Sequence, residues 1–264
     1  MRVTFLLERG SPPRMNPIVA EAASRLTDRG LAVSLRFPED EVVRIDQPAV
    51  DSDLYLLKSN TSLAFTLATV LDHLGARLVN SYAASLACRD KLLAAARLEA
   101  AGIPAPRSLV AGQPSQMAEQ LAAGPLIFKP YRGAFGRGVA VADSPAALPA
   151  VAAHPDLTFA QDYLASARTD LKVFVIGDEA FGVRKPFGSE SFLAYGEPVA
   201  LTPEAEALAR RVGQAFGLEL FGVDLAEDER GLHVFDVNFF PGFRGVPEAA
   251  RRLADYIAAA VQRG

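Results

Sequence analysis

The chain has 264 residues, 50% of them apolar, so it can bury a sizeable core in one composite domain or two small ones. Its net charge of -4, with acids and bases mixed along the sequence, argues against binding to nucleic acid or to an anionic membrane. One cysteine, Cys88, excludes an internal disulfide, and no segment approaches membrane-spanning length. We expect a globular cytoplasmic protein and leave homo-oligomerisation open.

The N-terminal region, residues 1–82, predicts a small open α/β layer. Asn16 followed by Pro17 is typical of a helix N-cap and first helical position, and a second helix is expected at 62–74. Short apolar runs predict strands at 2–7, 32–36, 54–57 and 77–79. This region is therefore expected to fold as an N-terminal α/β domain.

A new lobe is expected after a helix predicted from Ser85 to Gly102, because the run 103–106 (IPAP) cannot continue a helix. We expect this lid lobe at about residues 105–160, built around a glycine-rich turn. Its predicted strands are 108–110, 126–129, 139–142 and 157–160, and its predicted helices are 115–123 and 145–152.

The remaining residues predict two hairpins. The first joins 171–176 to 180–183 through Gly177-Asp178, and the second joins 220–225 to 232–238. A helix is expected between them at 203–216, and a last helix begins near Pro247.

The second hairpin carries the most informative polar side chains. Asp236 and Asn238 are two residues apart and so share a strand face, and Asp224 in the facing strand can join them. Carboxylate and amide oxygens suit Mg²⁺ that also binds phosphate oxygens. The alternative, solvated residues of an edge hairpin, fits less well because both strands are mostly apolar and buried carboxylates need partners.

Lys129 ends an apolar strand and precedes the sequence YRGAFGRG, which contains Gly136. Such a loop lets backbone N–H groups approach phosphates while the lysine supplies a charge. Its spacing matches neither the Walker P-loop nor the dinucleotide fingerprint, so alone it is a weak signal.

Two further segments could meet ligands. Lys172 and Arg184, on the first hairpin, could serve a phosphate or an anionic acceptor, although a solvated face is an alternative. The strand end FAQDYL could bind an adenine edge through backbone groups, with Tyr163 and Leu164 as apolar walls.

Six segments resemble, in order, the motifs of the ATP-grasp superfamily, over roughly residues 80–250. They are NSYAASLACRDKLLAAARLEAAGIPAP, LIFKPYRGAFGRGV, FAQDYL, DLKVFVIGDEAFGVRKP, FGVDLAED and DVNFFPGFRGVPEA. The resemblance implies an α/β (α+β) ATP-grasp fold. In it, a small N-terminal open α/β layer precedes two α+β lobes, residues 83–264, that clasp ATP.

The resemblance also implies roles for individual residues. Mg²⁺ would be held by Asp224, Asp236 and Asn238, while Lys172 and Arg184 would act in catalysis. ATP would be bound by Lys91, Lys129, Gly136, Gln161, Asp162, Tyr163, Leu164 and Lys172. Apart from the resemblance, Arg14, Lys58 and Arg184 could contact a carboxylate or phosphate of the acceptor substrate because of their charge.

Two branches of the superfamily compete as the model for the reaction. RimK-like carboxylate-amine ligases resemble the chain in CRDKLLAAARLEAAGIPAP and DLKVFVIGDE, but usually carry glutamate where this chain has Asp236. ATP-grasp inositol phosphate kinases resemble it in DVNFFPGF. Residues 1–80 lack the strongly basic character that a polyphosphorylated acceptor needs, so we favour the ligase. A non-catalytic ATP-binding module is the alternative of a different class.

Overall fold

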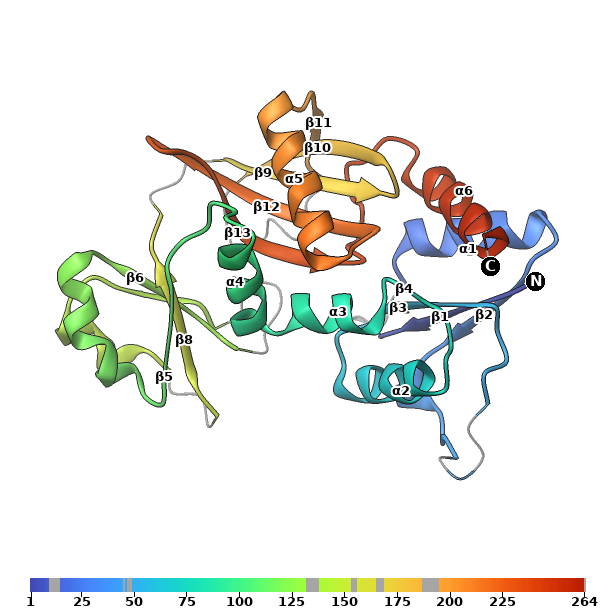
Figure 1. The fold of residues 1–264 in the computed structure, drawn as a ribbon, viewed down its shortest axis with the longest axis horizontal. Coiled ribbons are helices and arrows are strands. Elements are labelled where there is room, and N and C mark those ends of the chain that lie inside the picture. The colour runs from blue at the N-terminus through green and yellow to red at the C-terminus, as the bar shows by residue number, and fades with distance from the viewer. Residues whose placement is uncertain are drawn as a thin grey trace.

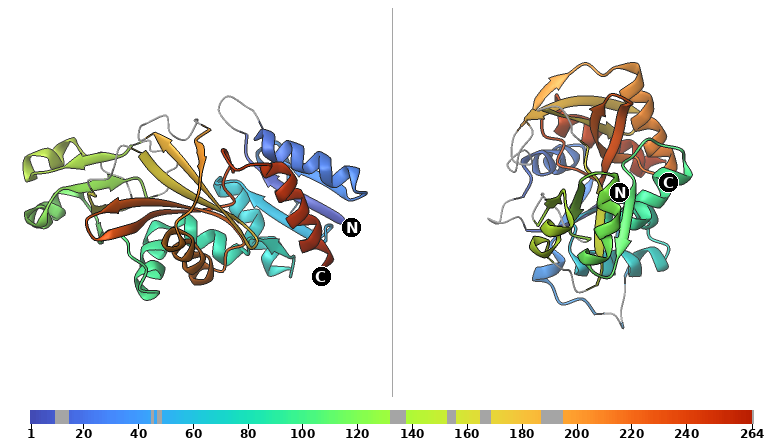
Figure 2. Two further views of the ribbon diagram at one scale, coloured as in Figure 1. Left: turned by 90° about the horizontal axis from the view of Figure 1, so that it is seen from above. Right: turned by 90° about the vertical axis from the view of Figure 1, so that its left-hand side faces the viewer.

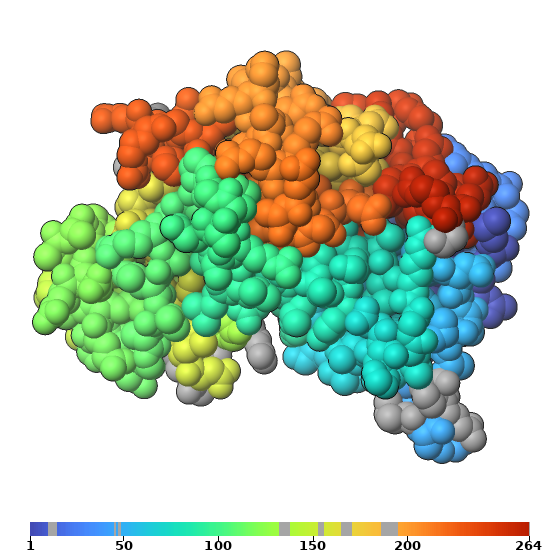
Figure 3. All heavy atoms as spheres, viewed as in Figure 1, coloured from blue at the N-terminus to red at the C-terminus, as the bar shows by residue number. Residues whose placement is uncertain are grey.

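The computed structural model describes residues 1–9, 15–44, 46, 49–131, 138–152, 156–164, 169–186 and 195–263. Figure 1 shows an elongated molecule with an N-terminal layer at one end, a lid lobe at the other and a C-terminal sheet between and above them. The three parts also remain distinct in the space-filling view of Figure 3. None of the described helices is long and apolar enough to cross a membrane.

The N-terminal layer is a parallel four-stranded sheet in the order β2-β1-β3-β4. Its strands are β1 (Arg2–Leu7), β2 (Ala32–Arg36), β3 (Leu54–Lys58) and β4 (Leu78–Val79), with α1 (Pro17–Asp28), η1 (Pro38–Asp40) and α2 (Ser62–His73) between them. The predicted cap is present, since the Asn16 side chain accepts from the Ile18 N–H at 2.9 Å. All four predicted strands form.

Two helices replace the single one predicted from Ser85 to Gly102. They are α3 (Tyr82–Arg89) and α4 (Lys91–Ala100). Asp90 separates them, because its backbone is extended and its side chain accepts from the N–H groups of Leu92 and Leu93, each at 3.0 Å. The aspartate thus caps a new helix, and that N-terminus begins at Lys91.

The lid lobe is an antiparallel sheet in the order β5-β8-β6-β7. Its strands are β5 (Ser108–Ala111), β6 (Leu126–Lys129), β7 (Ala140–Ala142) and β8 (Thr158–Asp162). The two predicted helices are 3₁₀ segments, η2 (Pro114–Ala123) and η3 (Pro145–Ala150). In η3 the internal Pro149 has no N–H to donate, which disfavours an α-helix there.

The C-terminal sheet is antiparallel in the order β11-β10-β9-β12-β13. Its elements are β9 (Thr169–Ile176), β10 (Glu179–Pro186), β11 (Glu197–Val199), α5 (Pro203–Phe216), β12 (Leu220–Asp228), β13 (Gly231–Phe239) and α6 (Ala249–Gln262). On α5, a Cβ added to Gly213 would lie only 2.7 Å from the Phe221 ring. The glycine therefore allows α5 to pack closely on the sheet.

The buried side chains form two hydrophobic cores among the described residues. One runs continuously through the N-terminal layer and the C-terminal sheet, and the other is confined to the lid lobe. Buried Asn80, just after β4, fastens the two larger parts, because it donates to the Leu220 carbonyl at 2.7 Å and accepts from the N–H groups of Glu219 and Leu220. The left view of Figure 2 shows α6 beside α1.

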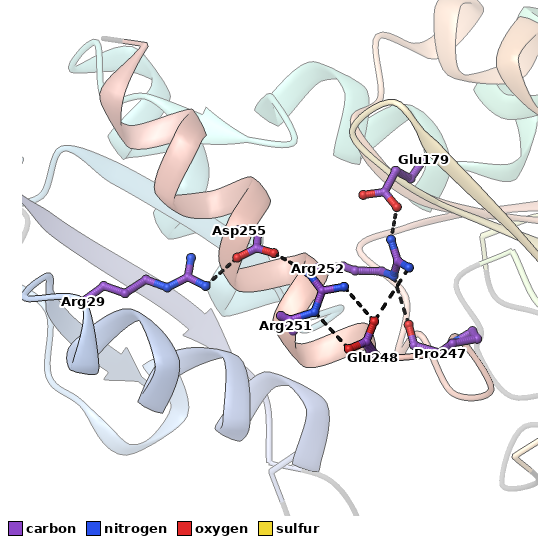
Figure 4. Close-up of polar contacts among 7 residues, drawn as sticks. All are labelled: Arg29, Glu179, Pro247, Glu248, Arg251, Arg252 and Asp255. Atoms are coloured by element: carbon purple, nitrogen blue, oxygen red, sulfur yellow. Dashed lines mark hydrogen bonds and ion pairs between the residues drawn. The ribbon is translucent and has the colours of Figure 1, made fainter.

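Charged side chains also join these parts at the surface. Figure 4 shows a chain of contacts from α1 through α6 to β10. Its members are Arg29, Asp255, Arg251, Glu248, Arg252 and Glu179. These pairs are largely exposed, so they fix orientation more than they add stability.

Candidate active site

Polar side chains from three neighbouring strands form a row on one face of the C-terminal sheet. Lys172 on β9 is the register partner of Asp224 on β12, which in turn is the partner of Asp236 on β13. The Lys172 Nζ lies 2.5 Å from an Asp224 carboxylate oxygen, and the two side chains are 16% and 11% exposed. Asn238, two residues after Asp236, shares the same face.

The oxygen atoms of this row fit a hard divalent cation. The Asn238 amide nitrogen lies 3.5 Å from an Asp236 carboxylate oxygen, so its amide oxygen remains available as a ligand. In the described part of the chain, no three His, Cys, Asp or Glu side chains are grouped so that they could hold a metal ion by themselves. A cation here would be bound by two carboxylates, one amide oxygen and the phosphate oxygens of a bound nucleotide, a set of ligands that is usual for Mg²⁺.

A β-bulge beside this row connects it to the lid lobe. The register shifts after Asp224, so that Phe235 is left out of the pairing between β12 and β13. Its carbonyl accepts from the Lys129 Nζ at 3.3 Å, and the same ammonium donates to the Gln161 side chain at 2.5 Å. Lys129 therefore bridges the two lobes.

The environment of Lys129 brings together several predicted residues. Burial lowers the pKa of its ammonium, and nearby Lys91 lowers it further, while Asp236 and Asp224 oppose this effect. Lys129 thus lies within electrostatic reach of Lys91 and of the two carboxylates.

A pH dependence follows from the lowered pKa. Lys129 loses its proton at a lower pH than a solvated lysine, whose pKa is 10.5. As the pH is raised, kcat/KM for ATP, which reports the free enzyme, should therefore decline with a midpoint below pH 10.5. Replacement Lys129→Arg keeps the charge and should move that decline to higher pH. Initial rates between pH 7 and 11 measure the effect. If kcat/KM declines at the same alkaline pH in both proteins, Lys129 has no role in ATP binding.

The lid sheet presents an apolar surface on the face that carries Lys129. Ile127 pairs with Gln161 and Val141, and Lys129 pairs with Phe159, so strand alternation puts all five side chains on one face. Val141 is 49% exposed. A flat, β-branched surface beside a few polar groups suits a nucleotide base. Sequence reasoning missed both Ile127 and Val141. Alternation counted from Lys129 would have found Ile127, whereas Val141 follows only from the register between β6 and β7.

Comparison with known proteins shows the family of this chain. A model of the RimK-like ATP-grasp domain matches residues 88–260. The chain belongs to the RimK-like ATP-grasp family. Its relatives include proteins named probable alpha-L-glutamate ligase from Mannheimia succiniciproducens and Haemophilus influenzae, each 30% identical. The first match covers 76% of this chain and 73% of the relative, and the second covers 78% and 76%.

Solved structures share the ATP-grasp fold. A RimK domain protein from Sphaerobacter thermophilus superposes with a TM-score of 0.80 at 20% identity, covering 97% of this chain and 99% of that one. D-cycloserine synthetase DcsG gives 0.77 at 17% identity, covering 98% and 99%. The ATP-grasp ligase PsnB, complexed with a precursor peptide and AMPPNP, gives 0.69 at 20% identity, covering 98% and 97%. The predicted ATP-grasp fold is confirmed.

In this RimK-like chain the strand exit after Gln161 lies at the base of the lid. The Asp162 carboxylate accepts from Arg107 at 3.0 Å, and its N–H donates to the Arg107 carbonyl. Tyr163 is 43% exposed and donates its N–H to Pro125, while Leu164 is partly buried. The Asp162 side chain is thus engaged within the lid base, and contact of this segment with adenine stays a prediction.

The structure does not bring Arg184 beside Lys172. Lys172 pairs with Val183, and Arg184 pairs with Leu171, so the exposed Arg184 belongs to the opposite face of the sheet. Its neighbour Lys185 shares the face of Lys172 and is only 4% exposed. Lys185 is therefore a second cation of this hairpin on the face of Lys172, and a role for Arg184 stays a prediction.

Other predicted residues are placed as follows. Lys91 is the first residue of α4, and the Asp90 cap beside it also accepts from the Tyr131 hydroxyl. Lys58 is the last residue of β3. Arg14 and Gly136 lie outside the described residues. Cys88 is buried, which raises the pKa of its thiol and agrees with an inert packing role.

Proposed function

We propose that this chain is an Mg-ATP-dependent carboxylate-amine ligase. The observation that carries the proposal is the row of Lys172, Asp224 and Asp236, joined to the lid lobe through Lys129. Two acids and two ammonium groups there could surround a polyphosphate and its cation. The relatives named probable alpha-L-glutamate ligase support ligation as the reaction.

In the first step an oxygen of the acceptor carboxylate would attack the γ-phosphorus of ATP. The bond to ADP breaks, ADP leaves with the electron pair, and an acyl phosphate forms. Lys129 and Lys91 would hold the phosphates of ATP, and Lys172 would offset charge on the transferring group. Mg²⁺ held by Asp224, Asp236 and Asn238 would supply Lewis-acid neutralisation of the phosphate oxygens.

In the second step an amine nitrogen would attack the carbonyl carbon of the acyl phosphate. The bond to phosphate breaks, inorganic phosphate leaves, and the nitrogen loses a proton as the amide forms. Because water would destroy the acyl phosphate, the lid lobe has to close over the site before the amine attacks. The contact of Lys129 with Phe235 is one connection that such closure can use.

The ion pair between Lys172 and Asp224 places an ammonium beside the two carboxylates of the row. Two carboxylates on adjacent strands repel each other, and the Lys172 ammonium compensates one of them. With Asp224 as a ligand of Mg²⁺, the Lys172 ammonium beside it would offset charge on the transferring phosphoryl group.

A trapping experiment tests the proposal. The protein is incubated with Mg-ATP, hydroxylamine and a panel of amino acids, small peptides and inositol phosphates, with glutamate and glutamyl peptides first because of the names of the relatives. ADP release and product mass are followed. We expect a hydroxamate, formed when hydroxylamine captures the acyl phosphate.

The other outcomes contradict the ligase. ADP release with a stable phosphorylated product and no hydroxamate would establish a kinase, the reaction of the inositol phosphate branch. Tight ATP binding without any ADP would establish a non-catalytic binding module.

A further inference from the structure

The junction between α3 and α4 lies where the parts of the molecule meet. Figure 1 shows these two helices between the N-terminal layer and the lid lobe. Arg89, the last residue of α3, lies over the Phe65 ring of α2, 4.3 Å from its centre, and donates to the Ser62 hydroxyl at 3.2 Å. The same ring packs edge-on against Phe239 at the end of β13, with the ring centres 5.5 Å apart. The junction is therefore held against both the N-terminal layer and the C-terminal sheet.

Helix α4 belongs to the body of the chain, by which we mean these two larger parts with their common core. Leu98 is buried in that core, and Arg97 donates to the Phe216 carbonyl of α5 at 3.2 Å. Lys91, the first residue of α4, is therefore fixed to the body, whereas Lys129 ends a strand of the lid sheet. The two lysines proposed to hold the phosphates of ATP come from different parts of the molecule.

A hydrogen bond joins the immediate neighbours of these two lysines. The Tyr131 hydroxyl donates to Oδ2 of Asp90, whose Oδ1 accepts from the first N–H groups of α4. Asp90 directly precedes Lys91, and Tyr131 is two residues after Lys129. One carboxylate thus caps the helix of the first lysine and holds the backbone that follows the second.

The lid side of this contact is closely packed. A Cβ added to Gly138 would lie 3.0 Å from Cγ of Pro130, and Gly138 has a φ of 72°, which favours glycine. The residue that leads into β7 therefore packs on the proline between Lys129 and Tyr131. The Tyr131 hydroxyl holds this packed corner of the lid sheet against α4.

The two ammonium groups favour separation of the lid from the body, because like charges repel. Lys91 is one of the charges that lower the pKa of Lys129. The hydrogen bond from Tyr131 to the charged Asp90 opposes this separation. Unlike the contact of Lys129 with the Phe235 carbonyl, it uses no group that the phosphates need. A site arranged in advance loses less free energy on ordering, so this bond should raise the affinity for the nucleotide.

We propose that Asp90 and Tyr131 are positioning residues, whose hydrogen bond holds Lys91 and Lys129 at the separation that the phosphates of ATP require. The inference rests on the proposed ATP-dependent function and adds two residues that act through the lysines. A purely electrostatic role of Asp90 predicts the opposite sign. Removing a carboxylate beside phosphate-binding lysines should then strengthen nucleotide binding, whereas loss of the positioning contact weakens it.

A double-mutant cycle tests the proposal, with the affinity of the full chain for Mg·AMPPNP measured by calorimetry. Asp90→Ser keeps an oxygen that caps α4 but is too short to reach Tyr131, and Tyr131→Phe removes only the hydroxyl. Asp90→Asn keeps the cap and offers its amide to the hydroxyl, so it tests for rescue. Tyr256→Phe is the matched control, because the Tyr256 hydroxyl also donates to a carboxylate, that of Glu219, at 2.7 Å.

We expect Asp90→Ser and Tyr131→Phe each to weaken binding about tenfold, and the double variant to bind about as weakly as either one. All three lack the same hydrogen bond. Asp90→Asn should lose less than about threefold, and Tyr256→Phe should stay within about twofold of the wild type. The inference is overturned if Tyr131→Phe binds like the wild type, if the two effects multiply in the double variant, or if Asp90→Ser binds more tightly.

Steady-state kinetics separates positioning from a merely structural role. Tyr131→Phe should raise the KM for ATP about tenfold and leave kcat and the KM for the acceptor nearly unchanged. A loss of folded protein would instead lower kcat at an unchanged KM, and that result would contradict the proposal.

The two proposals fail in different ways. A shared loss of AMPPNP affinity in a protein that forms no hydroxamate would reject the ligase but keep the positioning pair. Hydroxamate formation with independent or absent effects of Asp90→Ser and Tyr131→Phe would do the reverse. A wild-type chain that does not bind Mg·AMPPNP would overturn both.

Discussion

Replacement Asp236→Ala should reduce turnover at least about a thousandfold while the chain stays folded. Asp236 faces Asp224 across two strands, so the substitution removes half of the carboxylate charge available to Mg²⁺. It also relieves the repulsion between two like charges in register. Without Mg²⁺ the melting temperature should therefore be equal to or above that of the wild type, and Mg·AMPPNP should no longer raise it.

Asp228→Asn is the matched control for this prediction. Asp228 is a carboxylate of the same hairpin, but it pairs with Arg230 and His233 at the far end. Its replacement should leave turnover intact. Steady-state rates of both variants test the effect on turnover, and thermal melts with and without Mg·AMPPNP test the effect on folding and on nucleotide binding. Retained turnover in Asp236→Ala would refute the metal assignment.

Lys129→Met should lower kcat/KM for ATP by about a hundredfold or more, with little change in the KM for the acceptor. The substitution removes a buried ammonium that contacts Gln161 in the lid lobe and the Phe235 carbonyl in the C-terminal sheet. Stability should fall little, because burial already disfavours the charged form of this lysine.

The control for Lys129→Met lies in the same lobe. Glu119→Gln removes the charge of an exposed residue on η2, and η2 packs on the face of the lid sheet opposite Lys129. It should leave the kinetics for ATP unchanged. Nucleotide affinity measured with AMPPNP separates binding from chemistry. Wild-type affinity and kcat/KM in Lys129→Met would exclude a role for this residue in holding ATP.

The fold could be predicted largely because its signals are local. The Asn16-Pro17 start of α1, the strands of the N-terminal layer and both hairpins follow from periodicity and turn residues. The break at Asp90 could not be predicted, because the alanine- and leucine-rich pattern continues on both sides of this residue and an aspartate alone does not end a helix. Only the side-chain cap on Leu92 and Leu93 decides against it.

The candidate site was predictable where its residues share one hairpin. Asp224, Asp236 and Asn238 follow from alternation alone, whereas the bulge that exposes the Phe235 carbonyl to Lys129 depends on a register no sequence pattern indicates. The sheet face of Lys185 could also have been predicted from the sequence. Counting back from the Gly177-Asp178 turn pairs Lys172 with Val183, which places Lys185 and not Arg184 on its face.

The two ends of the lid lobe leave it side by side. Arg107 precedes β5 and Asp162 ends β8, and they are joined by an ion pair and a backbone hydrogen bond. The lobe also has a hydrophobic core of its own, separate from the core that unites the rest of the chain. A segment whose two ends lie side by side can be exchanged for another without changing the path of the rest of the chain. Recombination could therefore replace the lid sheet as a unit while the hairpin of Asp224 and Asp236 stays in place, provided that the contact between Lys129 and Phe235 is kept.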